Sequence, residues 1–545
     1  MKKTLRRTKG ITLIALVITI IVLLILAGVS IAMLTGENGI LTQAKNAKEA
    51  TAEAEKQEKK DLAQLEDYLN SQADSKYNES KGVNSPKLNG LIPIKWKDGS
   101  WVICSEDDTE WYDYSESEMK WANAMAQDGN FDASAPVGTK VEESQLGSMF
   151  VWIPRFAYSI KEYHTANNNG EGTKQEITDV EFLIGTTDVG AKTGTQYSKD
   201  YDATTINTGN ETPKITHPAF KLGDKELTGL WIGKFEASMK ETNNNTTGNN
   251  NVGQGKTVKV LPNKESWRYI QVGNCFKNVY NMRENAEYGF TSGIDTHLMR
   301  NSEWGAVAYL SASQYGKVPT MNNIYESYQE DSTTKYHAYT GGGKTAGDYI
   351  TNKSQSTTGN ETGIYDMNGG AWEYVAAYWD NENSNLSYYG TDEYFKGNKI
   401  NEKYSKYWEK YEVSENEKEQ MKGGLWNKDN TFNNERKKIA EERYNLMKNV
   451  KGDAMYEVIN TYSYYGKKTD GNYEWLMDLT ASSAQYGRAY YNNDYVLIGN
   501  CSLPFLRRGG GWWGSTSAGV FASYGSYGVP NDDGRFPSRV VGVAL

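Results

Sequence analysis

An uninterrupted run of apolar residues lies close to the start of the chain. Residues 11–34 contain no charged side chain, whereas residues 1–10 carry five lysines and arginines. As a helix, the run would extend roughly 36 Å, which is enough to cross the hydrocarbon core of a membrane. Because basic residues stay on the cytoplasmic side, we predict a basic leader over residues 1–10, a transmembrane helix and an extracellular remainder. A cleaved secretory signal is the alternative, although its apolar region is usually only about 7–15 residues long.

A weaker helical pattern follows the apolar run. Residues 40–72 are rich in Ala, Glu, Lys and Gln, which favour helices, and small or apolar side chains recur there at steps of three and four. We therefore predict a transmembrane and stalk helix over residues 11–72. Residues 73–90 are polar and contain Gly and Pro, so they are predicted to form a linker.

Short apolar runs flanked by turn residues dominate the rest of the chain. "LIPIKW", "SWVIC", "MFVWIPRFAYSI" and "LTGLWIGKFEAS" each have the length and flanks typical of β-strands. The charged residues 401–451 favour a helical insertion. We predict the α+β class, with a β-containing lead-in region over residues 91–148 and a main domain over residues 149–545.

Composition supports a β-rich outer part and narrows the choice of partner. The 545 residues include 39 Tyr and 15 Trp, so aromatic side chains supply much of the apolar content. The formal net charge is -10, which argues against nucleic acid as a partner.

Candidate metal ligands and nucleophiles are sparse. Cys104, Cys275 and Cys501 are far apart, and the four histidines form no close pair, so the spacing indicates neither a zinc site nor a disulfide scaffold. Whether two of the cysteines pair, and whether calcium binds, stays open at this point. We predict no catalytic residue, no cofactor and no transition-metal site.

The stretch "KGITLIALVITII" resembles the N-terminus of type IV prepilins, in which a basic leader ending in Gly is removed before an apolar helix. The resemblance implies cleavage between Gly10 and Ile11, anchoring in the cell membrane and pilin-like self-association. The family usually has Glu at the fifth mature position, where this chain has Ala15. That Glu is thought to pair with a neighbouring subunit, so polymerisation stays open.

Four later segments occur in the order found in one other family. "MFVWIPRFAY", "LMRNSEWGAVAYLS", "GIYDMNGGAWEYV" and "RRGGGWW...SRVV" resemble motifs of the formylglycine-generating enzymes, also called sulfatase-modifying factors. The resemblance implies a C-type lectin-like domain over residues 149–545. Small and apolar neighbours indicate that Trp304 and Trp372 pack in the core, and Gly509 and Gly510 are expected to allow close backbone approach.

The catalytic residues of that family have no counterpart here. Its enzymes bind copper through a cysteine pair between their R-G-G and G-F-R segments, and this chain has no cysteine between Gly510 and Arg539. We therefore predict that the chain is not an enzyme.

The closing segment, residues 507–545, is rich in Trp, Tyr, Ser and Gly, as antibody loops are. It resembles the variable proteins of diversity-generating retroelements, which use this segment to contact ligand. By that resemblance Trp512 and Phe521 are expected in the core and Tyr524 on the surface. The implied ligand-binding residues are Trp513, Ser517, Tyr524, Ser526, Tyr527, Asn531, Asp532 and Asp533.

These resemblances predict an adhesin-like bacterial surface protein that binds a surface protein or a glycan. Two alternatives stay open. One is a structural minor pilin without a specific ligand, and the other is an oxidase with an unrecognised site.

Overall fold

The computed structural model divides the chain into two compact units, Met1–Asn70 and Ser71–Leu545. The residues that the structure describes are 13–35, 39, 41, 43–55, 77–161, 178–201, 211–240, 255–267, 270–291, 293–320, 339–342, 348–380, 386, 393–397, 399–412, 415, 449–455, 457, 459–467, 473–477, 486–489, 495–497, 504–511, 518–526 and 540–544.

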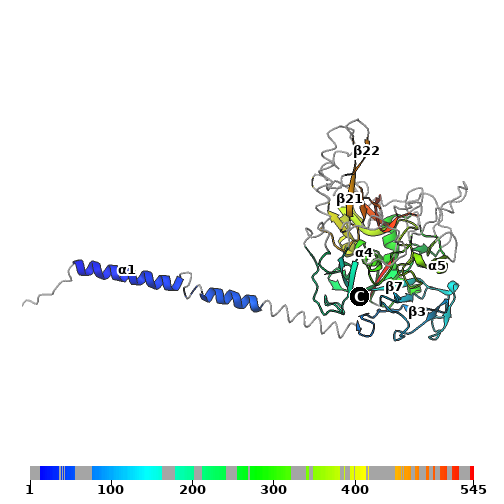
Figure 1. Ribbon diagram of the computed structural model, residues 1–545, viewed down its shortest axis with the longest axis horizontal. Coiled ribbons are helices and arrows are strands. Elements are labelled where there is room, and N and C mark those ends of the chain that lie inside the picture. The colour runs from blue at the N-terminus through cyan, green and yellow to red at the C-terminus, as the bar shows by residue number, and fades with distance from the viewer. Residues whose placement is uncertain are drawn as a thin grey trace, which may run out of the picture. The chain divides into compact units, whose positions relative to one another are not determined.

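The first unit is helical where it is described. Helix α1 covers Leu13–Thr35, drawn in dark blue in Figure 1, and residues 43–55 are also helical. Large apolar side chains of α1 between Leu16 and Val29 are 46–66% exposed. Among the described residues, no helix combines the length and the apolar character needed to cross a membrane.

The second unit contains an eight-stranded antiparallel sheet. Two of its strands, β7 and β13, are buried at every position, as expected for strands covered on both faces. In spatial order the strands are β16 (Ile294–Leu298), β27 (Val540–Ala544), β13 (Gly229–Gly233), β7 (Met149–Pro154), β5 (Asn123–Met125), β3 (Ile92–Lys97), β4 (Ser100–Ile103) and β6 (Lys140–Val141). The lead-in region 91–148 thus contributes four strands to the same sheet as the segments that follow it.

A second eight-stranded sheet contains the C-terminal hairpin. Its order is β20 (Glu409–Glu412), β17 (Glu373–Asp380), β25 (Phe505–Gly509), β26 (Gly519–Ser526), β24 (Tyr495–Leu497), β23 (Tyr486–Ala489), β21 (Ile459–Lys467) and β22 (Tyr473–Met477). The pairs β17–β20 and β24–β26 are parallel and the others are antiparallel.

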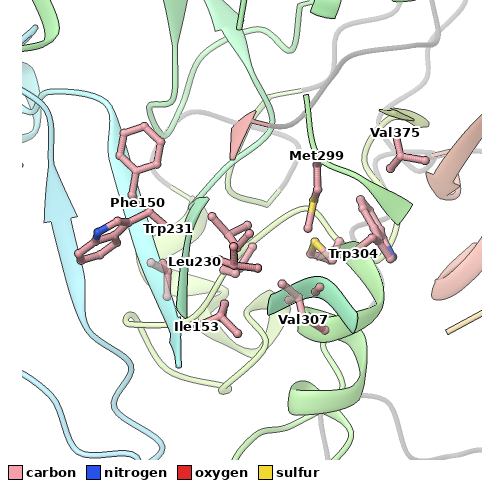
Figure 2. Close-up of a cluster of buried hydrophobic side chains, with 14 of the residues drawn as sticks. Phe150, Ile153, Leu230, Trp231, Met299, Trp304, Val307 and Val375 are labelled. Atoms are coloured by element: carbon pink, nitrogen blue, oxygen red, sulfur yellow. The ribbon is translucent and has the colours of Figure 1, made fainter. Parts of the chain in front are cut away.

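Helix α4 (Asn301–Ser311) lies within the core and is buried at all 11 positions. Most of its residues are small or apolar, which is typical of a helix enclosed by other elements, and its buried Glu303 is paired with Arg300. It contacts β17 and β26 of the second sheet. Figure 2 shows how its side chains continue the apolar cluster of β7 and β13; the labelled residues are Phe150, Ile153, Leu230, Trp231, Met299, Trp304, Val307 and Val375.

Shorter elements complete the described part of the second unit. The remaining helices are α3 (Val272–Asn281), α5 (Asp348–Thr351), and the 3-10 helices η1 (Glu143–Gln145), η3 (Pro218–Phe220), η4 (Met282–Glu284), η5 (Ala286–Tyr288), η7 (Lys353–Gln355) and η9 (Glu402–Tyr407). The remaining strands are β1 (Tyr77–Asn78), β2 (Val83–Asn84), β8 (Phe156–Ile160), β9 (Thr178–Phe182), β10 (Ile215–Thr216), β11 (Lys221–Leu222), β12 (Lys225–Glu226), β14 (Ser238–Met239), β15 (Val258–Lys259), β18 (Phe395–Lys396) and β19 (Lys399–Ile400).

The mixture of helices and sheets confirms the predicted α+β class. The segment predicted as a helical insertion, residues 401–451, begins with the short 3-10 helix η9 and the strand β20. Residues 416–448 of that segment lie outside the described part of the chain.

Candidate functional site

The hairpin of β25 and β26 is fixed to the core by Arg508, whose side chain is fully buried. One guanidinium nitrogen, Nη1, donates to Asn301 Oδ1 at 2.5 Å and to the Asp453 carbonyl at 2.8 Å. The other two donate to the carbonyls of Ala454, at 2.9 Å, and Ala522, at 3.0 Å. A buried cation is tolerated only when its donors are satisfied, so this side chain joins the hairpin, α4 and residues 453–454 into one scaffold.

Gly509 and Gly510 allow two close contacts at the end of β25. Both have a positive φ, 87° and 86°. A Cβ atom would lie 3.2 Å from the Trp304 ring at Gly509 and 2.3 Å from Ala518 Cβ at Gly510. The close backbone approach expected from the sequence is therefore confirmed.

The predicted core residues are buried where the structure describes them. Trp304 and Phe521 have no exposed surface, and Trp372 is 6% exposed. The indole Nε1 of Trp304 donates to the Val520 carbonyl at 2.7 Å, which ties α4 to β26. Trp512 lies outside the described residues.

Tyr524 is the one predicted ligand-binding residue whose side chain the structure describes, and it is half-buried. The expectation that it is an exposed anchor is wrong in this respect. Tyr524 pairs across the hairpin with Arg507, whose guanidinium carbon lies 4.7 Å from its ring centre and 5.6 Å from that of Trp372. The three side chains form a cation–aromatic stack that covers one side of the tyrosine.

The other predicted site residues cannot be placed in this arrangement. Ser526 is the last residue of β26, and its backbone is opposite Phe505. The rest lie outside the described residues: the ligand-binding candidates Trp513, Ser517, Tyr527, Asn531, Asp532 and Asp533, and the processing site Gly10 and Ile11.

The "GIYDMNGGAWEYV" segment is held by buried carboxylates. Glu236 accepts from the backbone N–H of Ala371 at 2.9 Å, and Asp366 accepts from that of Gly341 at 2.9 Å. Burial, together with the charges of Asp366 and Glu373, raises the pKa of Glu236 well above its ordinary value. These bonds to backbone donors make the cluster a structural support for the turn. Within the part of the chain that the structure describes, no group of three or more His, Cys, Asp or Glu side chains is arranged to hold a metal ion.

The described cysteines are poor candidates for thiol chemistry. Cys104 and Cys275 are buried, and Cys501 lies outside the described residues. Burial raises the pKa of the Cys104 thiol to about 12, so this thiol is protonated at neutral pH. Nucleophilic attack and soft-metal binding both require the thiolate.

Sequence reasoning missed a surface pocket of about 360 Å³ lined by residues 95–97, 109, 110, 112, 113, 118 and 120. A signal was present, because Lys95 and Lys97 alternate around Trp96 on a predicted strand and therefore share one face of it. Two lysines on one face favour an anion or a carboxylate-rich loop as neighbour, and a run of acidic residues follows at 106–110.

No protein-family model matches the chain, and no curated protein matches it at a significant level. The C-type lectin-like and prepilin-like assignments therefore rest on the sequence motifs and are carried forward as proposals.

Proposed function

We propose that this chain is a membrane-anchored bacterial surface protein that presents a C-type lectin-like, ligand-binding domain. The observation that carries the proposal is the hairpin of β25 and β26, which is fixed by Arg508 and carries the cation–aromatic stack of Arg507, Trp372 and Tyr524. A rigid scaffold bearing Tyr and Trp among Ser and Gly is the arrangement used by antibody-like binding surfaces.

Binding is favoured over catalysis because three charged groups near the hairpin, Arg508, Glu236 and Asp366, bond to groups within the protein. Arg508 bonds to backbone carbonyls and an amide, and Glu236 and Asp366 bond to backbone N–H groups. An active site needs a nucleophile or a base directed at open space, which these groups do not provide.

Anchoring follows from the basic leader and the apolar residues 11–34, with cleavage proposed between Gly10 and Ile11. Mass spectrometry of the membrane-bound protein should find Ile11 as the first residue. An intact Met1 in that sample would remove the prepilin-like part of the proposal. Sheared filaments that contain the protein, without any detectable ligand, would favour the minor-pilin alternative.

The binding proposal is tested with the full-length protein in detergent on an array of glycans and bacterial surface proteins. For a ligand found in this way, Tyr524→Ala should weaken binding by about 2 kcal/mol if the tyrosine is a hot spot. Tyr280→Ala is the matched control, because Tyr280 is also half-buried and stacked on an arginine, Arg283, at 3.9 Å. Equal effects of the two changes on binding would reject this site. Oxygen-dependent turnover of a cysteine peptide would favour the oxidase alternative.

A further inference from the structure

The pocket beside strand β3 is formed by lysines that converge on one acidic loop. Lys95 Nζ lies 2.7 Å from Asp108 Oδ2 and 2.7 Å from Glu110 Oε2. Lys97 Nζ lies 3.1 Å from the same Glu110 oxygen. These two lysines are therefore paired with carboxylates, and Glu110 is shared between them.

Two further lysines hold the same loop without a carboxylate partner. Lys81 Nζ donates to the Thr109 carbonyl at 2.7 Å, and Lys120 Nζ donates to the Glu110 carbonyl. A backbone carbonyl carries no net charge, and in the described part of the chain neither ammonium group forms an ion pair. Four lysines therefore approach a loop that carries four carboxylates, and among the described residues two of these lysines, Lys81 and Lys120, bond only to its backbone carbonyls.

Lys120 lies at the wall of the pocket and is half-buried. Burial is the main cause that lowers its pKa; the charge of Glu110 opposes this and that of Lys95 adds to it. An anionic group in the pocket would interact with the Lys120 ammonium in place of the water that burial has removed. The Lys97 side chain is 49% exposed, so the same anionic group could contact it as well.

The opposite part of the lining offers acceptors. Asp113 and Glu118 line the pocket, and one Asp113 oxygen already accepts from the backbone N–H of Ser115 at 2.9 Å. Carboxylates of this kind accept hydrogen bonds from hydroxyl groups and repel a second anion. The pocket therefore suits a ligand that carries one acidic group beside several hydroxyls.

The pocket walls are held in place before any ligand arrives. Trp111 and Tyr114 are buried on either side of the lining residue Tyr112. Trp111 Nε1 donates to the Asn123 carbonyl at 2.8 Å, and the Tyr114 hydroxyl donates to the Trp152 carbonyl at 2.5 Å. Both acceptors lie on strands of the first sheet, so the lining is attached to the core, as ligand sites usually are.

We propose that this pocket is a binding site for an acidic saccharide, with Lys97 and Lys120 contacting its carboxylate, sulfate or phosphate group and Asp113 and Glu118 accepting from its hydroxyls. The site lies outside the C-terminal hairpin and does not depend on the function proposed for it.

The test measures binding of the full-length protein in detergent to three polysaccharides: dextran sulfate, polygalacturonate and uncharged dextran. We expect at least one of the two polyanions to bind and uncharged dextran not to bind. The double change Lys97→Gln and Lys120→Gln should weaken binding of that polyanion about tenfold or more, and added salt should weaken wild-type binding. The control pair is Lys221→Gln and Lys225→Gln, which removes two exposed lysines on β11 and β12.

Thermal melts verify that both double variants remain folded. If the pocket double variant does not fold, the single change Lys97→Gln replaces it in the binding test. The proposal is overturned if neither polyanion binds, if uncharged dextran binds equally well, or if the control pair weakens binding as much as the pocket pair. Tyr524→Ala should leave polyanion binding unchanged. Weaker polyanion binding by Tyr524→Ala would place the bound polyanion at the hairpin and overturn the pocket as its site. If the hairpin binds no ligand of its own, this test of the pocket is unaffected.

Discussion

Arg508 shows how a single side chain can determine the position of a whole segment. Its guanidinium group spans five acceptors on three separate parts of the chain, in a planar fork that lysine cannot reproduce. Replacement by methionine would leave those acceptors buried without their donors.

We therefore expect Arg508→Met to lower the free energy of unfolding of the second unit by about 3–5 kcal/mol. Arg508→Lys should recover only part of this loss. Denaturant unfolding followed by tryptophan fluorescence measures the change, with the exposed Lys225→Met as a control for a surface substitution. A cost below about 1 kcal/mol would show that the buried acceptors find other partners.

His297 should make the stability of the protein depend on pH. It is buried, with its ring nitrogens 3.0 Å from Glu303 and 3.6 Å from Asp295. Burial alone would lower its pKa, but the charge of Glu303, with that of Asp295, raises the pKa above the ordinary 6.5. A raised folded-state pKa stabilises the protein fully below the unfolded pKa, and this contribution is lost as pH rises through the folded-state value.

The melting temperature of the second unit should therefore contain a component that declines above about pH 6.5 and is absent in His297→Gln. His217→Gln is the matched control. Burial, together with the charge of Arg300, lowers the pKa of His217 to about 3, so that histidine stays neutral over the same range. Retention of the full pH dependence in His297→Gln would assign it to other groups.

The burial of individual side chains was easier to predict from the sequence than their exposure. Small and apolar neighbours around Trp304, and the resemblance of the closing segment for Phe521, were enough to place both side chains in the core. Tyr524 was misjudged because its exposure depends on which residue stands across the hairpin. The register that places Arg507 opposite it is set by contacts far away in sequence, including the buried Arg508.

At the level of elements, helix α4 can lie where it does because Gly305 has no side chain. A Cβ atom added to Gly305 would lie 2.0 Å from the carbonyl oxygen of Gly452, which is too close for any real contact. The helix therefore packs directly against the backbone of another segment.

Gly305→Ala should destabilise the second unit by about 1–3 kcal/mol, although alanine is the better helix former by about 1 kcal/mol. Gly28→Ala is a helical control in the first unit, where nothing lies within 4 Å of an added Cβ, and it should leave the melting of the second unit unchanged. Differential scanning calorimetry of the two variants distinguishes them. A gain in melting temperature for Gly305→Ala would mean that α4 can shift away from Gly452.

Strands were predicted one by one, whereas the sheet that they form was not. Alternating or continuous apolar runs identified β3, β4, β7 and β13 from local sequence alone. Nothing local indicated that β3 to β6 would join the sheet of β7, because antiparallel pairing is decided by side-chain packing between segments distant in the chain. The pocket beside β3 was missed for the same reason, since its walls meet only when residues 109–120 fold against that strand.

At the scale of the whole molecule, the two compact units imply separate stabilities. Contacts divide the chain between Asn70 and Ser71. Removing residues 1–70 should therefore change the melting temperature of the second unit by no more than about 2 °C. Calorimetry of the full chain in detergent and of residues 71–545 measures this. A larger fall would show that the first unit contributes to the stability of the second.

The place of β27 in the first sheet has a consequence for folding during synthesis. This strand comes after every other described strand in the chain, yet it pairs with both β13 and β16. While the chain emerges from the ribosome, β16 cannot be joined to the rest of its sheet until residues 540–544 have arrived. The domain must therefore complete its folding late, in a single step that closes the sheet, and until then its unpaired strand edges need protection from neighbouring chains.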